Sequence, residues 1–205
     1  MSTTAPVLAL DDAHVYRLDG QVIPGCTEVI RAAGLMDYDG APEDVMERAR
    51  WRGSAVHRAC WFDDEGTLDE EKLAAEVWPY LLAWRAAKDT LGITITSRDF
   101  LAIEAPIYHA ILRYGVTPDR LIRRPDGMCC AIDLKTGSLQ PWMAIQLAAQ
   151  VMAVGGSWYH RIACRLAPSR TPPFIYRIYP RSEIAADFAV FQGALAIYNW
   201  KAARK

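Results

Sequence analysis

The sequence lacks long apolar runs and any strong excess of charge. No stretch of about 18 apolar residues is free of charged side chains, so we expect no transmembrane helix. Residues 1–10 lack a basic region followed by an apolar block, which argues against a secretory signal and predicts a soluble, cytoplasmic protein. The net charge of −1 gives no indication of a nucleic-acid partner.

Cysteine is present in a number and spacing that exclude the common cysteine-based sites. The five cysteines are Cys26, Cys60, Cys129, Cys130 and Cys164. An odd number without paired spacing argues against a disulfide framework, and the absence of CxxC argues against a zinc ribbon or an iron–sulfur cluster. Cys129 and Cys130 are adjacent in a predicted strand, so they should point to opposite faces as buried thiols.

What the sequence does contain is enough apolar material for a real core. Hydrophobic residues make up 52% of the 205 residues and charged residues 23%, which excludes a long disordered chain. Periodicity and turn residues predict the following elements: a lead-in without structure (1–13), a hairpin around Asp19-Gly20 (14–23), a short helix from Thr27 to Gly34, helices at 42–64 and 68–91, strands at 100–108, 110–116, 119–123 and 128–134, a helix at 141–154, strands at 161–166 and 174–179, and a final helix capped by Ser182.

This order of elements predicts an α/β fold with a mixed central β-sheet flanked by helices. The core order is α-β-β-β-α-β, and one α/β sandwich accounts for it. We expect residues 1–41, the N-terminal hairpin and short helix, to pack on a core formed by residues 42–205 that includes the C-terminal helix.

Three charged residues lie where two of these strands approach each other. Asp119 stands near the start of one strand, and Asp133 and Lys135 stand near the end of the next. Because side chains alternate along a strand, Asp133 and Lys135 share a face, and a hairpin through Pro125–Gly127 brings Asp119 towards them. Two carboxylates placed together favour a cation between them, and oxygen ligands suit Mg²⁺ or Mn²⁺.

A structural explanation of the same residues remains open at this point. Asp119 would pair with Arg120 or Arg123 in solvent, and Lys135 would be an exposed strand residue. Asp-x-Lys occurs often by chance. The apolar residues 129–132, however, lead directly into the charged residues, and binding sites form where a central strand ends.

One sequence motif resembles that of the PD-(D/E)XK nucleases, most closely the RecB-like and phage-type exonuclease branch. The motif is Pro118-Asp119 followed by Asp133-Leu134-Lys135-Thr136-Gly137. The resemblance implies a restriction-endonuclease-like core. It implies that Asp119 and Asp133 bind the metal and act in catalysis, that the carbonyl of Leu134 faces the metal, and that Lys135 is catalytic.

The branch also places a histidine on a preceding helix, and Gly53-Ser54-Ala55-Val56-His57 supplies it. His57 falls on the same helical stripe as Val56 and Cys60, so it is expected to face the core. A lone core-facing histidine is usually structural, whereas the resemblance implies a metal ligand. We expect Gly53 to allow a close approach of the helix to the sheet under either interpretation.

Further positions are candidates through the same resemblance. Gln146 and Gln150 lie one helical turn apart, with Gln150 where the branch carries tyrosine, and they are candidate DNA contacts together with Thr136. A solvated helix face is the alternative for Gln150. Glu104 lies where related nucleases often carry a glutamate, and it is a candidate catalytic residue or an ordinary polar strand position.

The resemblance implies a DNA exonuclease dependent on Mg²⁺ or Mn²⁺ that hydrolyses phosphodiesters with metal-activated water, an endonuclease being the less favoured form. It further implies DNA as partner in phage recombination or DNA processing, with a single-strand annealing or other recombination protein and a homo-oligomer as further expected partners. No membrane partner is expected. The alternative is a protein of the same fold that binds DNA or inhibits a host enzyme without cutting.

Overall fold

The centre of the molecule is a five-stranded mixed β-sheet. The computed structural model describes residues 6–36, 42–93, 100–123, 126–155 and 160–204. The sheet order is β10-β9-β8-β7-β4, with β8 and β9 parallel and the other neighbours antiparallel. Its strands are β4 (Phe100–Ile103), β7 (Arg120–Arg123), β8 (Cys129–Lys135), β9 (His160–Leu166) and β10 (Phe174–Tyr179).

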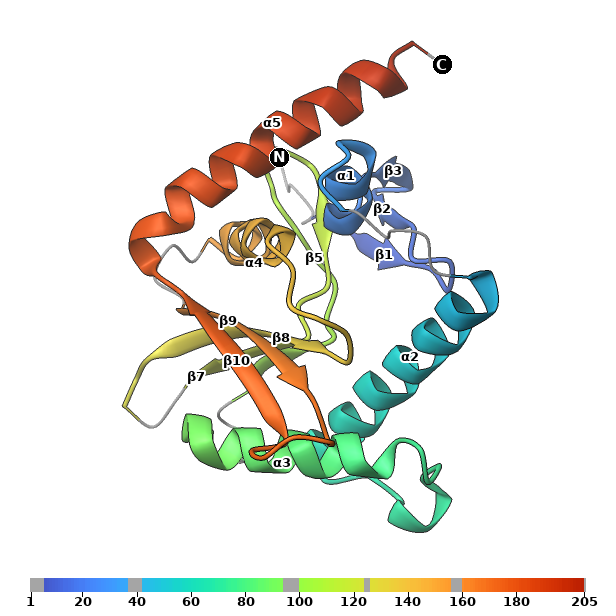
Figure 1. Ribbon diagram of the computed structural model, residues 1–205. Coiled ribbons are helices and arrows are strands. Elements are labelled where there is room, and N and C mark those ends of the chain that lie inside the picture. Colours follow the sequence, from blue (N-terminus) through green and yellow to red (C-terminus); the bar gives the residue numbers. More distant parts are fainter. Residues whose placement is uncertain (1–5, 37–41, 94–99, 124–125, 156–159, 205) are drawn as a thin grey trace.

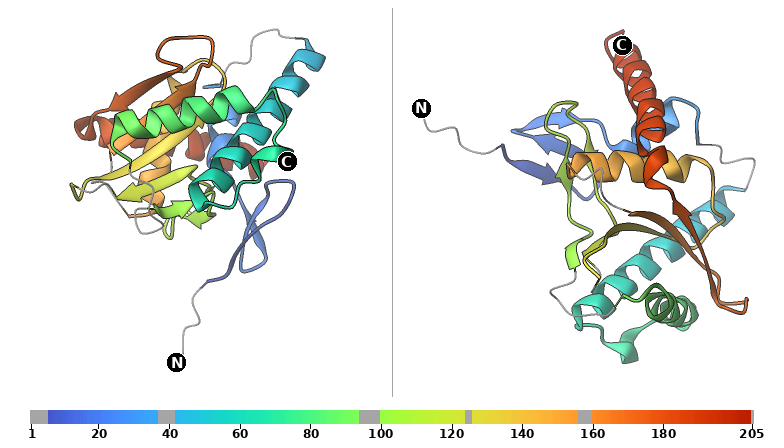
Figure 2. Two further views of the ribbon diagram at one scale, coloured as in Figure 1. Left: turned by 90° about the horizontal axis from the view of Figure 1, so that it is seen from below. Right: turned by 90° about the vertical axis from the view of Figure 1, so that its left-hand side faces the viewer.

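Helices cover both faces of this sheet. α2 (Glu43–Glu65) and α3 (Trp78–Leu91) lie on one face, and α4 (Trp142–Ala153) lies on the other (Figures 1 and 2). α5 (Ile184–Ala202) packs on α4 on the side away from the sheet (Figure 1). The order of α3, β4, β7, β8, α4 and β9 gives the α-β-β-β-α-β core, and the predicted α/β fold with a mixed sheet flanked by helices is confirmed.

Strand β8 is apolar on both sides because both of its faces are covered by helices. Cys129 and Ala131 pack in the cluster that includes α4, whereas Cys130, Ile132 and Leu134 pack in the cluster with α2 and α3. The prediction of opposite faces for Cys129 and Cys130 is confirmed. All five cysteines are buried and free. Among the described helices, none combines the length and the apolar character needed to cross a membrane.

The N-terminal segment packs on α4 and α5 through its helix. It contains a small antiparallel sheet of β1 (Leu8–Leu10), β2 (Tyr16–Leu18) and β3 (Gln21–Ile23), followed by α1 (Cys26–Ala32), which contacts α4 and α5. The ring of Tyr16 lies so close to Gly115 that a Cβ there would stand 2.2 Å from Cγ of the ring. Gly115 belongs to β6 (Gly115–Val116), which pairs with β5 (Ile107–Tyr108) apart from the main sheet.

Several predicted boundaries are wrong. The helix expected over 68–91 begins only at Trp78, after a 3-10 turn at Glu70–Lys72, because Pro79 fits the first turn of a helix and not its middle. The lead-in contains β1, and of the strand expected over 110–116 only residues 115–116 form a strand, while residues 110–112 form a turn. Ser182 lies in a second 3-10 turn, Arg181–Glu183, and does not cap α5. Residues 124–125 of the expected hairpin turn lie outside the described residues.

Candidate metal centre

The pairing of β7 with β8 places two carboxylates at the same end of the sheet. Arg120 pairs with Ile132 in an antiparallel register, so one step further along the two chains Asp119 comes beside Asp133. Asp119 contacts the end of β8 directly, because the backbone N–H of Leu134 donates to Oδ2 of Asp119 over 2.6 Å. The predicted approach of Asp119 to the end of β8 is therefore present in the structure.

Helix α2 brings His57 to this point. Nε2 of His57 lies 3.0 Å from the carbonyl oxygen of Leu134, while Nδ1 faces two carboxylates. Gly53, one turn earlier, is not needed for this approach, because a Cβ there would meet only Oγ1 of Thr136, at an ordinary contact of 3.8 Å. The expected role of Gly53 in close packing is therefore wrong, since a small side chain fits.

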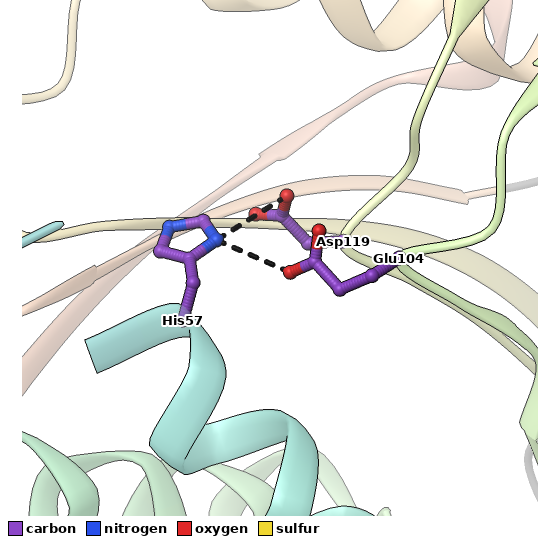
Figure 3. A group of neighbouring side chains, drawn as sticks. All are labelled: His57, Glu104 and Asp119. Carbon is purple, nitrogen blue, oxygen red and sulfur yellow. Dashed lines mark hydrogen bonds and ion pairs between the residues drawn. The ribbon is translucent and has the colours of Figure 1, made fainter. Parts of the chain in front are cut away.

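The two carboxylates facing Nδ1 of His57 belong to Glu104 and Asp119. Oε1 of Glu104 lies 3.3 Å from Nδ1, and Oδ1 of Asp119 lies 3.5 Å from it (Figure 3). One donor atom from each residue lies within 4.8 Å of the others, which is the arrangement that a single divalent cation needs. We call His57, Glu104 and Asp119 the donor cluster.

The backbone of Glu104 is strained, which marks it as an unusual strand-end residue. It follows β4 directly and has φ of +46°, in the left-handed region that non-glycine residues rarely adopt. Its N–H donates to the carbonyl oxygen of Asp119 over 3.2 Å, which ties the two members of the donor cluster through the main chain. Such strain persists where surrounding contacts hold it, often at functional sites.

Asp133 and Lys135 adjoin the donor cluster without being part of it. Asp133 is fully buried, and its Oδ2 lies 2.6 Å from Nζ of Lys135. Burial is the largest effect on the pKa of Asp133 and raises it, and the nearby charge of Asp119 adds to the rise. Lys135 lowers the pKa but does not outweigh these effects, so the pKa is raised to about 6. Nζ of Lys135 also stands 5.7 Å from the centre of the Trp142 ring, so the ammonium is held between a carboxylate and an aromatic face.

The carboxylates of Asp119 and Glu104 shift the pKa of His57. Burial lowers its pKa, but Asp119 and a hydrogen bond to Glu104 outweigh burial and raise the pKa to about 8. In the absence of a cation, a proton on the ring is thus the group that offsets the negative charge. A divalent cation can replace that proton, leaving Nε2–H to donate to the carbonyl of Leu134.

The donor set fits a divalent metal by charge as well as by distance. Three carboxylates, from Glu104, Asp119 and Asp133, lie close enough to affect His57 or one another. Apart from a protonated His57, the described cations paired with them are Lys135 and Arg120, and Arg120 is also paired with Asp64. One imidazole nitrogen with carboxylate oxygens suits Mn²⁺ well and Mg²⁺ less so.

A cavity of about 400 Å³ opens beside the donor cluster, and it contains both predicted glutamines. Its lining includes Thr117 and, from the N-terminal segment, His14. The lining also includes Glu104, Asp119, Gln146 and Gln150. Gln150 is only 2% exposed, so the solvated helix face considered for it is excluded. The described residues provide no hydrogen-bond partner for Oε1 of either glutamine, although both atoms are buried.

One of the sequence alternatives is wrong, and three of the predicted roles stay predictions. Arg120 is fully buried, so the suggestion that it pairs with Asp119 in solvent is wrong. The carbonyl of Leu134 lies within hydrogen-bond distance of Nε2 of His57, and Asp133 lies outside the three-residue donor cluster, so their roles as metal ligands stay predictions. Thr136 is half-buried beside Gly53. Its DNA contact stays a prediction as well.

Sequence reasoning missed Arg120 and the contributions of His14 and Thr117. Arg120 reaches Glu104 with Nη1 at 3.4 Å, and the hydroxyl of Thr117 is hydrogen-bonded to Tyr16 over 2.7 Å. No pattern in the sequence indicates that these residues belong to the site. An arginine in a short strand, such as Arg120, is predicted to be exposed. His14 has φ of +57°, which is visible only in the structure.

Comparisons with known proteins give a weak structural likeness and nothing from sequence. No protein-family model matches the chain, and no curated protein matches it. Two solved structures of the alkaline exonuclease LHK-Exo from Laribacter hongkongensis are similar. The one in complex with dAMP has 17% identity and a TM-score of 0.40, covering 89% of this chain and 94% of that chain. The other has 16% identity and a TM-score of 0.30, covering 73% and 92%. A likeness at this level assigns no side chain a role.

Proposed function

We propose that the protein is a divalent-metal-dependent deoxyribonuclease that hydrolyses DNA phosphodiester bonds. The observation that carries this proposal is the donor cluster: an imidazole and two carboxylates within 4.8 Å of one another, next to a buried carboxylate paired with a lysine. This combination of oxygen and nitrogen ligands with an adjacent ammonium suits the stabilisation of charge on a phosphate.

The residues divide into those that hold the cation and those that act on the phosphate. His57, Glu104 and Asp119 would hold Mg²⁺ or Mn²⁺, with Asp133 and the carbonyl of Leu134 as further candidate ligands. When bound, the cation lowers the pKa of water and neutralises charge on the phosphate. Lys135, kept in place by Asp133, would orient the attacking water and stabilise the negative charge that develops on the phosphate oxygens.

The cavity beside the cluster is the proposed place for the DNA backbone. The amide oxygens of Gln146 and Gln150 are buried and have no hydrogen-bond partner among the described residues, and both side chains line the cavity. The N–H₂ groups of the same side chains can donate to phosphate or sugar oxygens. Thr136, at the end of β8 after Lys135, would contribute a further hydroxyl.

Exonuclease rather than endonuclease action is the finer form of the proposal, in keeping with the resemblance of the motifs. DNA is the proposed partner, and a single-strand annealing or other recombination protein and a second copy of this chain are further proposed partners. A setting in phage recombination or DNA processing follows from the same resemblance.

The experiment is digestion of linear and closed circular DNA, single- and double-stranded, with Mg²⁺, Mn²⁺ or EDTA. We expect linear DNA to be degraded with either metal, circular DNA to survive, and EDTA to stop the reaction. Asp119→Asn and Lys135→Gln should each lower the rate by about 10³-fold, since Asp119 would hold the cation and Lys135 would stabilise the charge of the transition state.

The control is Lys72→Gln, which removes an exposed lysine paired only with a neighbouring aspartate and should leave the rate unchanged. Cutting of circular DNA would favour an endonuclease. Activity with Mg²⁺ but never with Mn²⁺ would contradict His57 as a ligand. A folded wild-type protein that binds DNA but cuts none of these substrates would be the non-cutting binding protein.

A further inference from the structure

Arg120 is buried beside the donor cluster and belongs to a second, deeper set of charges. Its side chain is fully inaccessible to solvent. Nε donates to Oδ2 of Asp64 over 2.6 Å, and Nη1 donates to the carbonyl oxygen of Asp119 over 2.6 Å. The same Nη1 lies 3.4 Å from Oε1 of Glu104, which is also the oxygen that faces Nδ1 of His57.

The far end of this arginine is fixed by the interior of the protein. Asp64 accepts from Nζ of Lys88 at 2.6 Å and from Nε1 of Trp84 at 3.0 Å, so α3 holds the carboxylate that holds Arg120. The guanidinium also lies 5.9 Å from the centre of the Trp84 ring. A planar group with contacts on three sides has little freedom to rotate, so it presents Nη1 at a fixed point.

We propose that Arg120 is a positioning residue that holds the carboxylate of Glu104 towards His57 and Asp119, the other members of the donor cluster. This inference rests on the proposed function, because it assigns Glu104 to the metal that the nuclease would use. Glu104 needs such a support: its backbone is strained at φ of +46°, and its side chain is 21% exposed at the edge of a cavity. An unsupported glutamate there would have several rotamers open to it.

The sign of the effect separates positioning from simple electrostatics. A positive charge beside a metal site repels the cation, so loss of the arginine's charge would strengthen metal binding if charge alone mattered. If Arg120 orders Glu104, its replacement weakens metal binding although the repulsion falls or stays the same. Partners that orient a metal ligand change affinity by about 10- to 100-fold when they are mutated.

The test is the dissociation constant of Mn²⁺ alone, measured without DNA by electron paramagnetic resonance of the free ion. Arg120→Lys keeps the charge but loses the planar fork, and we expect Mn²⁺ binding to weaken by about 10- to 100-fold. The matched control is Arg161→Lys, which alters another fully buried strand arginine, bonded to Asp187 and to the carbonyls of Ala144 and Pro180. It should stay within about twofold of the wild type.

A double-variant cycle distinguishes action through Glu104 from general damage. Glu104→Gln should weaken Mn²⁺ binding, and adding Arg120→Lys in that background should change it by less than about twofold. Additive losses would overturn the proposal, as would unchanged binding in Arg120→Lys. Should Arg120→Lys not fold, Asp64→Asn replaces it, with an expected loss of about tenfold; unchanged affinity in that variant would also overturn the proposal.

Failure of this inference and failure of the proposed function give different results. A wild-type protein that binds Mn²⁺ and cuts DNA, with Arg120→Lys binding Mn²⁺ equally well, would remove the positioning role and leave the nuclease intact. A wild-type protein that neither binds Mn²⁺ nor cuts DNA would overturn both.

Discussion

Two groups of charged side chains lie next to each other, and Arg120 contacts both of them. The two groups differ in the balance of their positive and negative charges. Around Asp64, the carboxylates of Asp63 and Asp64 are matched by Lys88, Arg85 and Arg120, with every ion pair at or below 2.9 Å. In the donor cluster, the carboxylates outnumber the cations, and the distances from His57 to Glu104 and Asp119 are 3.3 and 3.5 Å.

The difference separates a structural network from a site that needs something added. Buried charges cost free energy unless they are paired and hydrogen-bonded, and the Asp64 network meets that condition from its own residues. Without a cation, the donor cluster relies on protonation of His57, whose pKa is raised to about 8, and the pKa of Asp133 beside the cluster is raised as well. Perturbed groups beside a cavity are typical of functional sites. The comparison predicts that Lys88, whose described ion pairs lie within the network, should act on stability, whereas the donor cluster, with Arg120 as its link to the network, should control metal binding.

The largest effect on stability is expected from the balanced network. Lys88 is 2% exposed, and its replacement by methionine leaves Asp63 and Asp64 with fewer cations in a buried place. We expect Lys88→Met to lower the free energy of unfolding by about 3 kcal/mol, measured by urea denaturation. Lys72→Met, at an exposed lysine, should cost less than about 1 kcal/mol. Equal costs for the two variants would show that the network contributes nothing beyond a surface pair.

The donor cluster should gain stability from metal where the network does not. At a Mn²⁺ concentration of about 100 times the dissociation constant, the free energy of unfolding should rise by about 2.7 kcal/mol, because only the folded chain holds the ligands together. The rise should disappear on addition of EDTA and should be absent in Asp119→Asn. The same rise in Asp119→Asn would place the ion elsewhere on the protein.

The sequence predicted the parts of this comparison that depend on local pattern. Asp133 and Lys135 follow from strand alternation, and Asp119 follows from the hairpin that joins β7 to β8. His57 came from a motif at helical spacing. The sheet and its flanking helices came from the order of short β-rich runs and longer helical ones.

The rest could not be predicted because it depends on contacts between distant elements. Glu104 was a candidate through the resemblance, but its contact with His57, 47 positions away, was not predicted. The contact of Asp64 with Arg120, 56 positions away, was not predicted either. From the sequence alone, Asp64 near the end of a helix is predicted to be exposed to solvent. The same prediction applies to Arg120 in its four-residue strand. Only the packing of α2 and α3 against the sheet shows that both are buried.

The smallest effect expected is on the pH dependence of stability without metal. The folded-state pKa of His57 is raised from 6.5 to about 8, and that of Asp133 from 3.8 to about 6, so the folded protein favours the protonated form of both. Their stabilising contribution is complete below each unfolded pKa and is lost as the pH rises through the folded value. The full contribution of His57 is about 2 kcal/mol, and in EDTA His57 alone should therefore lower the free energy of unfolding by about 1 kcal/mol between pH 6.5 and pH 8.

His57→Gln isolates this contribution, since urea denaturation of the variant across the same pH range should lack the fall. With saturating Mn²⁺ the slope should reverse, because the cation takes the place of the proton on Nδ1 and binds more tightly as the ring is deprotonated. A fall of equal size in His57→Gln would mean that the imidazole does not carry the charge that offsets Glu104 and Asp119. The charges of the donor cluster would then be balanced by the protein's own residues, as they are in the network around Asp64. The reason to place a cation in the cluster would be gone.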